Sequence, residues 1–467
     1  MRKRLIWFRD DLRITDNSAF TAALEGISPD HLEAVFLTAD HDWRDFGYGQ
    51  NRLFYTEKLL RSLASSLALC GIAFQVVKLN TYSEQAAWVI KYCRDHSIDS
   101  LYINHEYQLN EIKRDRLIMQ KLESDVTVKG FTDRIIIRPG TVRTGEDKYY
   151  TVFSPFKRRW LEALKQTDYR IYGRPAQVTA SESLADWEPL AIEPLSNISW
   201  AATNETQAQT HLQQFIEGKL SRYGQDRNGP ALSGTSQISP YLARGLLSPR
   251  QCLHGVESAL NCSIWEVADV EFTWINELIW REFYQHLLIG FPKLSMNQAF
   301  RSETENVAWL NSKESIERWK NGTTGIPIVD AGMRELKATG WMHNRVRMIV
   351  AQFLTKNLLC DWRIGELHFM DWLIDSDLGA NNGGWQWSAS TGTDAAPYFR
   401  IFNPVSQGES HDGDGTYVTR WIPELASLPI KNRHAPWTTE KPLNYPPPIV
   451  NLKESRQRAI DTFKELK

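Results

Sequence analysis

The segment WLIDSDLGANNGGWQWSASTGTDAAPYFRIFNP, residues 372–404, concentrates carboxylates, amides, glycines and tryptophans more densely than an ordinary core helix requires. Gly383 and Gly384 permit close approach to the backbone and dihedral angles that other residues avoid. Trp385 and Trp387 are two positions apart, so on a helix they point about 200° apart. One indole can then face a buried cofactor while the other faces a cavity open to substrate. The alternative interpretation is a polar, aromatic-lined loop that closes a helical core.

The composition is that of an ordinary globular protein. The chain has 467 residues, 42% hydrophobic and 24% charged, which favours two domains over one. It contains no uninterrupted apolar run of the ~20 residues that a membrane span needs. The five cysteines are scattered without a C-x-x-C pair, which indicates free thiols in a reducing compartment. We therefore expect a cytoplasmic protein of the bacterial cytoplasm and nucleoid, without membrane attachment and without a metal site.

Residues 1–135 alternate short apolar runs with helical patterns. The runs lie at 5–8, 34–37, 74–77 and 101–104, with helical stretches at 18–25, 51–70, 83–96 and 109–123. Buried strands joined by helices predict a doubly wound parallel sheet, which is an α/β fold. No G-x-G-x-x-G follows the first run, which disfavours a Rossmann-type dinucleotide site. Polar residues that suit a small ligand follow the fourth run, although helix capping explains them equally well: Asn104, Glu106, Asn110 and Glu111.

The rest of the chain divides into a connector, 136–203, and a helical domain, 204–467. Prolines punctuate the connector, and its one clear helical pattern is at 153–165. Ser239-Pro240 and Ser248-Pro249 each predict a helix start, with serine as N-cap and proline at the first helical position. The turn at 234–236 before the first of these starts is suited to a pyrophosphate.

Two of the expected helices carry faces that are unsuited to a simple core. The helix at 274–286 has a face both aromatic and charged, formed by Trp274, Glu277, Trp280 and Arg281. The helix at 341–355 places three residues on one face and points Arg345 elsewhere, toward a phosphate: Asn344, Arg347 and Met348. Residues 331–363 carry six Lys/Arg against two Asp/Glu, although the net charge is −2. Such a run can form a nucleic-acid-binding face or a solvated helix surface.

Several motifs occur in the order typical of one family. They are LIWFRDDLRITDN (5–17), GTSQISPYLARGLLSPRQ (234–251), WINELIWREFYQH (274–286), GIPIVDAGMRELKATGWMHNRVRM (325–348) and YFRIFNP (398–404). With residues 372–404 they resemble the photolyase/cryptochrome family over nearly the whole chain, and most of all its bacterial class I members, which repair cyclobutane pyrimidine dimers. The resemblance implies an amino-terminal antenna domain and a carboxyl-terminal helical domain that binds FAD.

The resemblance also implies a light-driven lyase. In this family an excited, fully reduced FAD gives one electron to a dimer flipped out of the DNA stack, the cyclobutane ring opens, and the electron returns. The dimer cavity then matches Glu277, Trp280, Asn344, Met348 and Trp387, while Asn381 matches the residue beside flavin N5. The DNA-backbone contacts match Arg227, Arg345, Arg400 and Gln407. The expected partner is damaged DNA, and the expected state is a monomer.

The resemblance assigns further residues to FAD and to electron supply. The flavin contacts match Tyr223, Thr235, Ser236, Gln237, Ile238, Ser239, Trp274, Arg281, Arg347, Asp375 and Asp377. Gln237 departs from the arginine usual in close relatives, which puts an ionic phosphate contact there in doubt. The tryptophans that carry electrons from the surface to the flavin match Trp309, Trp362 and Trp385.

The antenna is the part where the sequence departs most from the pattern. Asn110 and Glu111 match the residues that hold the pterin of 5,10-methenyltetrahydrofolate. Phe46 replaces a histidine, and Ser295-Met296 replace a Cys-Lys pair. We therefore expect a folate antenna that is lost easily on purification. An empty cleft, or a flavin or deazaflavin antenna, is the alternative.

Three rival members of the family fit less well. A (6-4) photolyase would carry histidines where Asn344 and Met348 stand, and a DASH-type single-strand photolyase typically has glutamine at Met348. A cryptochrome-type blue-light photoreceptor usually has a long extension after the final motif, whereas this sequence continues for about sixty residues. The sequence therefore favours repair of cyclobutane dimers over these alternatives.

Overall fold

The computed structural model describes residues 3–177, 185–186, 190–439 and 444–466. The chain forms two compact units. Unit 1 comprises Met1–Glu193, Ser199–Leu220 and Ser236–Pro292, and unit 2 comprises Pro194–Ile198, Ser221–Thr235 and Lys293–Lys467. The functional domain boundaries at 135 and 203 stay predictions. No helix among the described residues is long and apolar enough to cross a membrane.

Unit 1 contains a parallel sheet of six strands in the order β5-β4-β1-β2-β3-β6. The strands are β1 (Lys3–Phe8), β2 (Leu32–Leu37), β3 (Ala73–Val77), β4 (Ile98–Asn104), β5 (Thr127–Phe131) and β6 (Ala185–Asp186). The four predicted strands and the doubly wound α/β fold are thus confirmed. The sequence did not predict β5, because this edge strand is largely exposed and lacks an apolar run.

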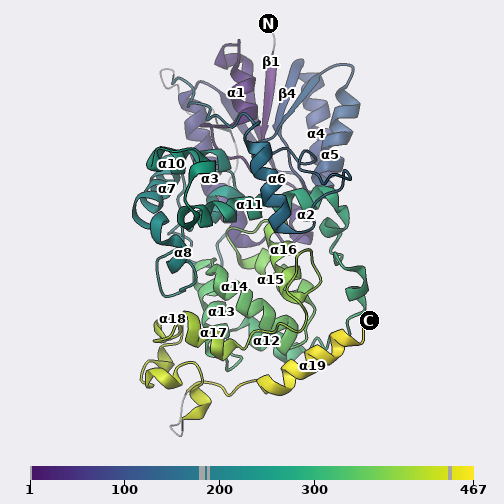
Figure 1. The fold of residues 1–467 in the computed structure, drawn as a ribbon. Helices are drawn as coiled ribbons and strands as arrows, with labels where there is room; N and C mark the ends of the chain where they lie inside the picture. The colour runs from purple at the N-terminus through teal and green to yellow at the C-terminus, as the bar shows by residue number, and fades with distance from the viewer. Residues whose placement is uncertain (1–2, 178–184, 187–189, 440–443, 467) are drawn as a thin grey trace. The chain divides into compact units, whose positions relative to one another are not determined.

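The crossover helices agree with the sequence prediction. They are α1 (Ser18–Leu24), α3 (Gln50–Leu69), α4 (Tyr82–Asp95) and α5 (Leu109–Leu122), and a short α2 (Asp40–Asp45) precedes α3. Figure 1 shows α1 on one side of β1 and β4, and α4 and α5 on the other. The strand order reverses between β1 and β4, because the chain adds β2 and β3 on one side of β1 and then returns to add β4 on the other. Such a switch point is where parallel sheets place polar ligand-binding loops.

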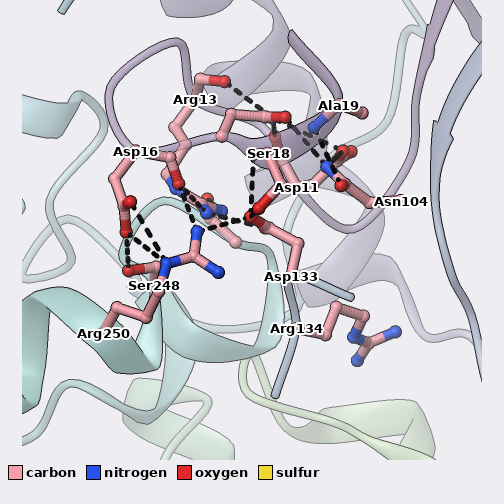
Figure 2. Close-up of polar contacts among 12 residues, drawn as sticks. Asp11, Arg13, Asp16, Ser18, Ala19, Asn104, Asp133, Arg134, Ser248 and Arg250 are labelled. Carbon is pink, nitrogen blue, oxygen red and sulfur yellow. Dashed lines mark hydrogen bonds and ion pairs between the residues drawn. The ribbon is translucent and has the colours of Figure 1, made fainter. Parts of the chain in front are cut away.

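Buried charges fill the region beyond the carboxyl ends of β1, β4 and β5 (Figure 2). Asp133 accepts from Arg13 at 2.6 Å and from Arg250 at 2.7 Å, and it is completely buried. Ser18 donates to the same carboxylate through its backbone and its hydroxyl. Arg250 also binds Asp16 at 3.2 Å. These contacts join the sheet to the helices of the same unit, because Arg250 belongs to α10 (Pro249–Leu260).

The remaining helices of unit 1 are α6 (Phe153–Leu164), α7 (Glu205–Lys219), α9 (Ser239–Ala243), α10 and α11 (Asp269–Gly290). The predicted cap at Ser248 is confirmed, since its hydroxyl accepts from the Gln251 amide at 3.0 Å within a capping box. The predicted cap at Ser239 is wrong. That helix begins at Ser239 itself, after Ile238, and no side chain caps it.

Unit 2 is helical throughout its described residues. Its helices are α8 (Tyr223–Asp226), α12 (Lys313–Lys320), α13 (Pro327–Thr339), α14 (Asn344–Gln352), α15 (Trp362–Trp372), α16 (Leu378–Ala389), α17 (Pro404–His411), α18 (Thr416–Trp421) and α19 (Leu452–Lys464). Gly340 ends α13 in the left-handed region, at φ 67°, and a π-helical turn (Phe353–Asn357) extends α14. Helix α16 packs against both α14 and α15.

Candidate functional site

Helix α16, from the segment quoted first, presents two different faces. Asp377 caps its start by accepting from the Ala380 amide at 3.1 Å. The face with Trp385 is buried, and the indole lies against Gly365 of α15. The opposite face is partly open: Trp387 is half-buried, and a Cβ added at Gly384 would meet no atom within 4 Å. The two indoles therefore point in different directions, as the two-residue spacing predicts.

A chain of hydrogen bonds fixes the orientation of Asn381. Its Nδ2 donates to the backbone carbonyl of Glu366 at 2.9 Å. The carboxylate of Glu366 accepts from Asn382 at 2.8 Å, and Asn382 in turn accepts from Gln386 at 2.9 Å. Burial raises the pKa of Glu366 to about 7. With Nδ2 bonded to α15, Oδ1 is the remaining polar atom of the half-buried Asn381 side chain. No sequence pattern indicated the role of Glu366, because its contact with Asn381 joins two helices.

Arg347 and Asp375, two of the expected flavin contacts, form an ion pair. The guanidinium Nη2 donates to both carboxylate oxygens, at 3.2 and 2.9 Å, and Nε donates to the Met342 carbonyl at 2.8 Å. The Asp375 side chain is 3% exposed, whereas that of Arg347 is 24% exposed. Removal of either partner would leave the other charge without its counterion. Such a half-buried pair near the N-terminus of α16 can bind a polar ring edge.

The other expected flavin contacts are distributed over both units. Tyr223 and Thr235 belong to unit 2, whereas Ser236, Gln237, Ile238 and Ser239 belong to unit 1. Gln237 adopts φ 51°, in the left-handed region, which is uncommon for a residue other than glycine. Gly234 lies so close to Asp226 that a Cβ would approach its backbone oxygen to 2.8 Å. This loop is therefore held in a specific backbone conformation at its two ends.

Two residues of α11 with a predicted flavin role make their described contacts with protein. Trp274 is 2% exposed, and its ring packs 5.1 Å from that of Phe215. Arg281 donates to the carbonyls of Arg134 and Leu242, the latter at 3.1 Å. These contacts explain the two residues as part of the core of unit 1. Their flavin role stays a prediction.

The five residues expected around the dimer fall into two groups. Glu277 and Trp280 are half-buried on α11 of unit 1. Trp280 stacks on Phe153 of α6, with centroids 3.7 Å apart and planes at 6°, a partner that the sequence did not reveal. In unit 2, Asn344 is exposed and Met348 half-buried one turn later on α14, and Trp387 is half-buried on the neighbouring α16. Each group presents an aromatic ring or thioether beside a polar head.

Three arginines that the resemblance assigned to DNA lie near one another in unit 2. Burial lowers the pKa of the Arg345 guanidinium, and the charges of Arg227 and Arg400 lower it further. Asn228 holds Arg345 in place through its Oδ1, at 2.7 Å. His411 of α17 is also close enough for its pKa to be lowered by Arg345 after burial, and Gln407 precedes it by one turn. The predicted backbone-binding residues thus form one cationic group.

Several cations of the basic run at 331–363 have partners within the unit, and whether the run binds nucleic acid stays a prediction. Arg334 pairs with Glu424 at 2.7 Å and Arg363 with Glu305 at 2.6 Å. Lys356 is completely buried and donates to the carbonyl of Ala389. Most of these cations are therefore paired or buried within the unit. Their partners lie far away in the sequence, so local charge does not reveal them.

The three tryptophans of the expected electron path share one hydrophobic cluster. Trp362 and Trp385 are buried within it, at 1% and 2% exposure, and Trp309 packs against it half-buried. Trp309 also contacts Phe463 of α19, with ring centroids 6.0 Å apart. The cluster therefore extends from α16 toward solvent.

The predicted antenna residues behave differently from each other. Asn110 is half-buried, whereas Glu111 turns inward and accepts from the Tyr82 hydroxyl at 2.8 Å. Burial and the neighbouring charge of Glu106 raise the pKa of Glu111 to about 7. Glu111 lines a cavity of only ≈ 40 Å³ at the carboxyl ends of β1 and β2, which has room for about one water molecule. The cavity walls also include Trp7, Trp43, Tyr48, Arg52 and Arg114. A folate or a flavin would therefore enter this site only if the side chains around it moved.

Comparison with known proteins gives a consistent result. The family model "FAD binding domain of DNA photolyase" matches residues 274–465, and the model "DNA photolyase" matches residues 4–177. Deoxyribodipyrimidine photo-lyase from Salmonella typhimurium is 41% identical over 474 residues, covering 99% of this chain and 98% of the relative.

Solved structures agree over the same length. A class III photolyase from Agrobacterium tumefaciens has a TM-score of 0.88 and 34% identity, covering 100% of this chain and 98% of that one. An archaeal photolyase from Sulfolobus tokodaii with two FAD molecules has a TM-score of 0.80 and 27% identity, covering 99% and 100%. The chain belongs to the DNA photolyase family.

Proposed function

We propose that this protein is a light-dependent DNA repair lyase that splits cyclobutane pyrimidine dimers with FAD as its cofactor. The observation that carries the proposal is helix α16, which holds the amide of Asn381 in a fixed orientation against α15, leaves the backbone open at Gly384 and buries Trp385. Full-length similarity to a deoxyribodipyrimidine photo-lyase supports it.

The residues of unit 2 fit a flavin on the open face of α16. Asn381 offers Oδ1 to the N5 position, and Asp377 and the Arg347–Asp375 pair offer charged and polar groups to the ring edges. When bound, reduced FAD supplies one electron on excitation and takes it back after the ring opens. The protein orients the ring and keeps water from it. The Asn381 amide stays hydrogen-bonded to the Glu366 carbonyl.

DNA recognition falls to two kinds of side chain. Arg227, Arg345 and Arg400 neutralise phosphates and position the duplex without reading its sequence. Trp280, Met348 and Trp387 hold the flipped bases by apolar contact, while Glu277 and Asn344 bond their polar edges. A damaged base pair costs least to extrude, which favours lesions over intact DNA.

The decisive experiment is repair of irradiated oligothymidine by the purified, flavin-loaded protein. Base absorbance should recover under blue or near-ultraviolet light and stay unchanged in darkness. Recovery in darkness, or none in light with reduced flavin present, would contradict the proposal.

Arg345→Ala is expected to weaken DNA binding about equally on all sequences. Loss of one phosphate contact should reduce the slope of log affinity against log salt by about 0.9. Fluorescence anisotropy at several salt concentrations measures this slope. Arg456→Ala, an exposed arginine on α19, is the matched control and should leave the slope unchanged. An equal effect of both variants would remove Arg345 from the DNA interface.

For the antenna we propose 5,10-methenyltetrahydrofolate, with Asn110 and Glu111 as its contacts. Because Glu111 lines a small cavity and already bonds the Tyr82 hydroxyl, uptake requires Tyr82 to give up its bond to the carboxylate. A hydrogen bond to a charged group contributes about 1.5–3 kcal/mol, so Glu111 can sustain specificity without tight retention. The alternative, a second flavin, is prompted by the archaeal relative with two FAD molecules.

Titration with each chromophore distinguishes these antennae. Added methenyltetrahydrofolate should restore a near-ultraviolet band and speed repair at limiting light, and Glu111→Ala should abolish both effects. Glu123→Ala, on an exposed glutamate after the same helix, serves as control. Uptake of FAD in excess of one equivalent, without uptake of folate, would assign the cavity to a flavin instead.

A further inference from the structure

A second row of aromatic rings leads from Trp385 to the surface of unit 2. The ring of Trp319 in α12 lies 6.0 Å from that of Trp385, at 76°, and it is completely buried. His368 of α15 follows at 5.4 Å from Trp319, and Trp372 at 6.0 Å from His368. Trp372 is half-buried at the end of α15. Each ring contacts the next, so the row is continuous from the core to a half-buried indole.

We propose that Trp372 is a second electron-entry residue, connected to Trp385 through Trp319 and His368. This inference rests on the proposed function and on the tryptophan path that the resemblance implies, in which we take Trp385 as the residue that donates directly to a photoexcited, oxidised flavin. Trp385 loses one electron to the flavin and recovers it from Trp319, which recovers it from Trp372. The oxidised Trp372 then releases its indole proton, and an external thiol returns one electron and one proton to it.

The surroundings of Trp319 favour onward transfer over trapping. Its Nε1 donates to the carbonyl of Val350 at 3.1 Å, and a carbonyl cannot take the proton from an oxidised indole. The charge therefore moves to the next ring. Phe369 fills the angle between Trp319 and Trp385, with its ring 5.0 Å from that of Trp385, and keeps water out of this step.

His368 stays neutral within the row. Burial lowers the pKa of its imidazole to about 3, and the charges of Lys320 and Lys337 add to this effect. A neutral ring bridges the two indoles without opposing a positive charge on either of them. Lys337 lies 5.8 Å from the ring centroid of Trp372. The charge of Lys337 disfavours a radical cation on Trp372 and so promotes loss of its indole proton. Once the proton is lost, the oxidised state stays on Trp372.

The row differs from the expected path through Trp362 and Trp309 only after Trp385. Both rows start at this indole, and each ends at a half-buried tryptophan of unit 2. Because Trp385 can receive an electron from either row, replacing Trp309 or Trp372 alone should not stop electron supply. That redundancy is the measurable consequence of the proposal.

Photoreduction of the oxidised flavin in the presence of a thiol tests it, with Trp→Phe variants that keep most of the ring's bulk but are far harder to oxidise. Trp309→Phe should retain photoreduction, and Trp309→Phe/Trp372→Phe should lose it, down to the level of Trp385→Phe. Transient absorption and electron paramagnetic resonance should show a tryptophan radical in Trp309→Phe that disappears in the double variant. Trp421→Phe, at another half-buried tryptophan of unit 2, should not change the signal when combined with Trp309→Phe.

The failures of the two ideas are distinguishable. If the single variants Trp309→Phe and Trp385→Phe each abolish photoreduction, the second row is wrong and the proposed function stands. If the double variant photoreduces as fast as Trp309→Phe, Trp372 is not an entry residue. If Trp385→Phe photoreduces normally, the place of Trp385 in the expected electron path is wrong, and with it both rows. Trp319→Phe should reproduce the effect of Trp372→Phe, with circular dichroism to verify its fold.

Discussion

Asp133→Ala is expected to destabilise the protein by about 3–5 kcal/mol, because it leaves two buried arginines without their carboxylate. Arg13 and Arg250 contact Asp133 at 2.6 and 2.7 Å, and the three side chains are at most 6% exposed (Figure 2). Arg250 keeps Asp16, but Arg13 loses its one ion pair among the described residues. Denaturant unfolding followed by tryptophan fluorescence should show a lower midpoint.

The matched control is Asp168→Ala, which removes an exposed carboxylate from its pair with Arg170. Exposed pairs contribute between 0 and about 1 kcal/mol, so the midpoint should hardly move. Equal midpoints for the two variants would show that the buried network contributes no more than a surface pair.

The same carboxylate makes stability depend on acid. Burial alone would raise the pKa of Asp133, but the charges of Arg13 and Arg250 outweigh it and hold the pKa well below its ordinary value of 3.8. A carboxyl group with a lowered pKa in the folded state stabilises fully above its ordinary pKa, and this contribution is lost as the pH falls toward the folded value. As the pH falls below 4, the free energy of unfolding should therefore decrease less in Asp133→Asn than in the parent protein.

Gly365→Ala should displace Trp385 and so reduce both stability and photoreduction. A Cβ at this position would lie 2.0 Å from Cη2 and 2.3 Å from Cζ3 of the Trp385 ring, and the ring is held on its other sides by Trp319 and Phe369. Overpacking of this kind costs about 1–3 kcal/mol. The strain also reaches Asn381, whose amide bonds the next residue of α15. Thermal unfolding and the rate of flavin photoreduction measure the two effects.

Gly218→Ala provides the control, because the same change on helix α7 meets no atom within 4 Å. In a helix, alanine is more favourable than glycine by about 0.5–1 kcal/mol, so this variant should be slightly stabilised. A Gly365→Ala protein that unfolds and photoreduces like the parent would mean that the α15–α16 contact adapts without moving the indole.

Patterns that are local in the sequence were sufficient for much of the fold. The apolar runs of β1 to β4 and the helical stretches between them predicted the parallel sheet, because strands buried on both faces need apolar residues throughout. The cap at Ser248 followed from two adjacent residues, Ser248 and Pro249. The cap at Ser239 was wrong, because the N-cap of that helix is Ile238, whose side chain cannot accept a hydrogen bond.

Contacts between residues far apart in the sequence decided the site. The carbonyl of Glu366 that orients Asn381, the glycine that admits Trp385, and the stacking of Phe153 on Trp280 have no periodic signature. Motif resemblance nominated Asn381, Trp385 and Trp280 without revealing what holds them.

Charge and cavity size show the same limit. The basic run at 331–363 suggested a DNA-binding face, but tertiary packing buries Lys356 and pairs Arg334 and Arg363, because their partners lie up to 90 residues away. Likewise the resemblance predicted Asn110 and Glu111 as antenna contacts, whereas in the fold Glu111 lines a cavity of ≈ 40 Å³. The sequence by itself determined the family, the sheet and the residues that carry the chemistry. Only the tertiary structure decided which of them are held, paired or exposed, because desolvation and ion pairing depend on neighbours in space.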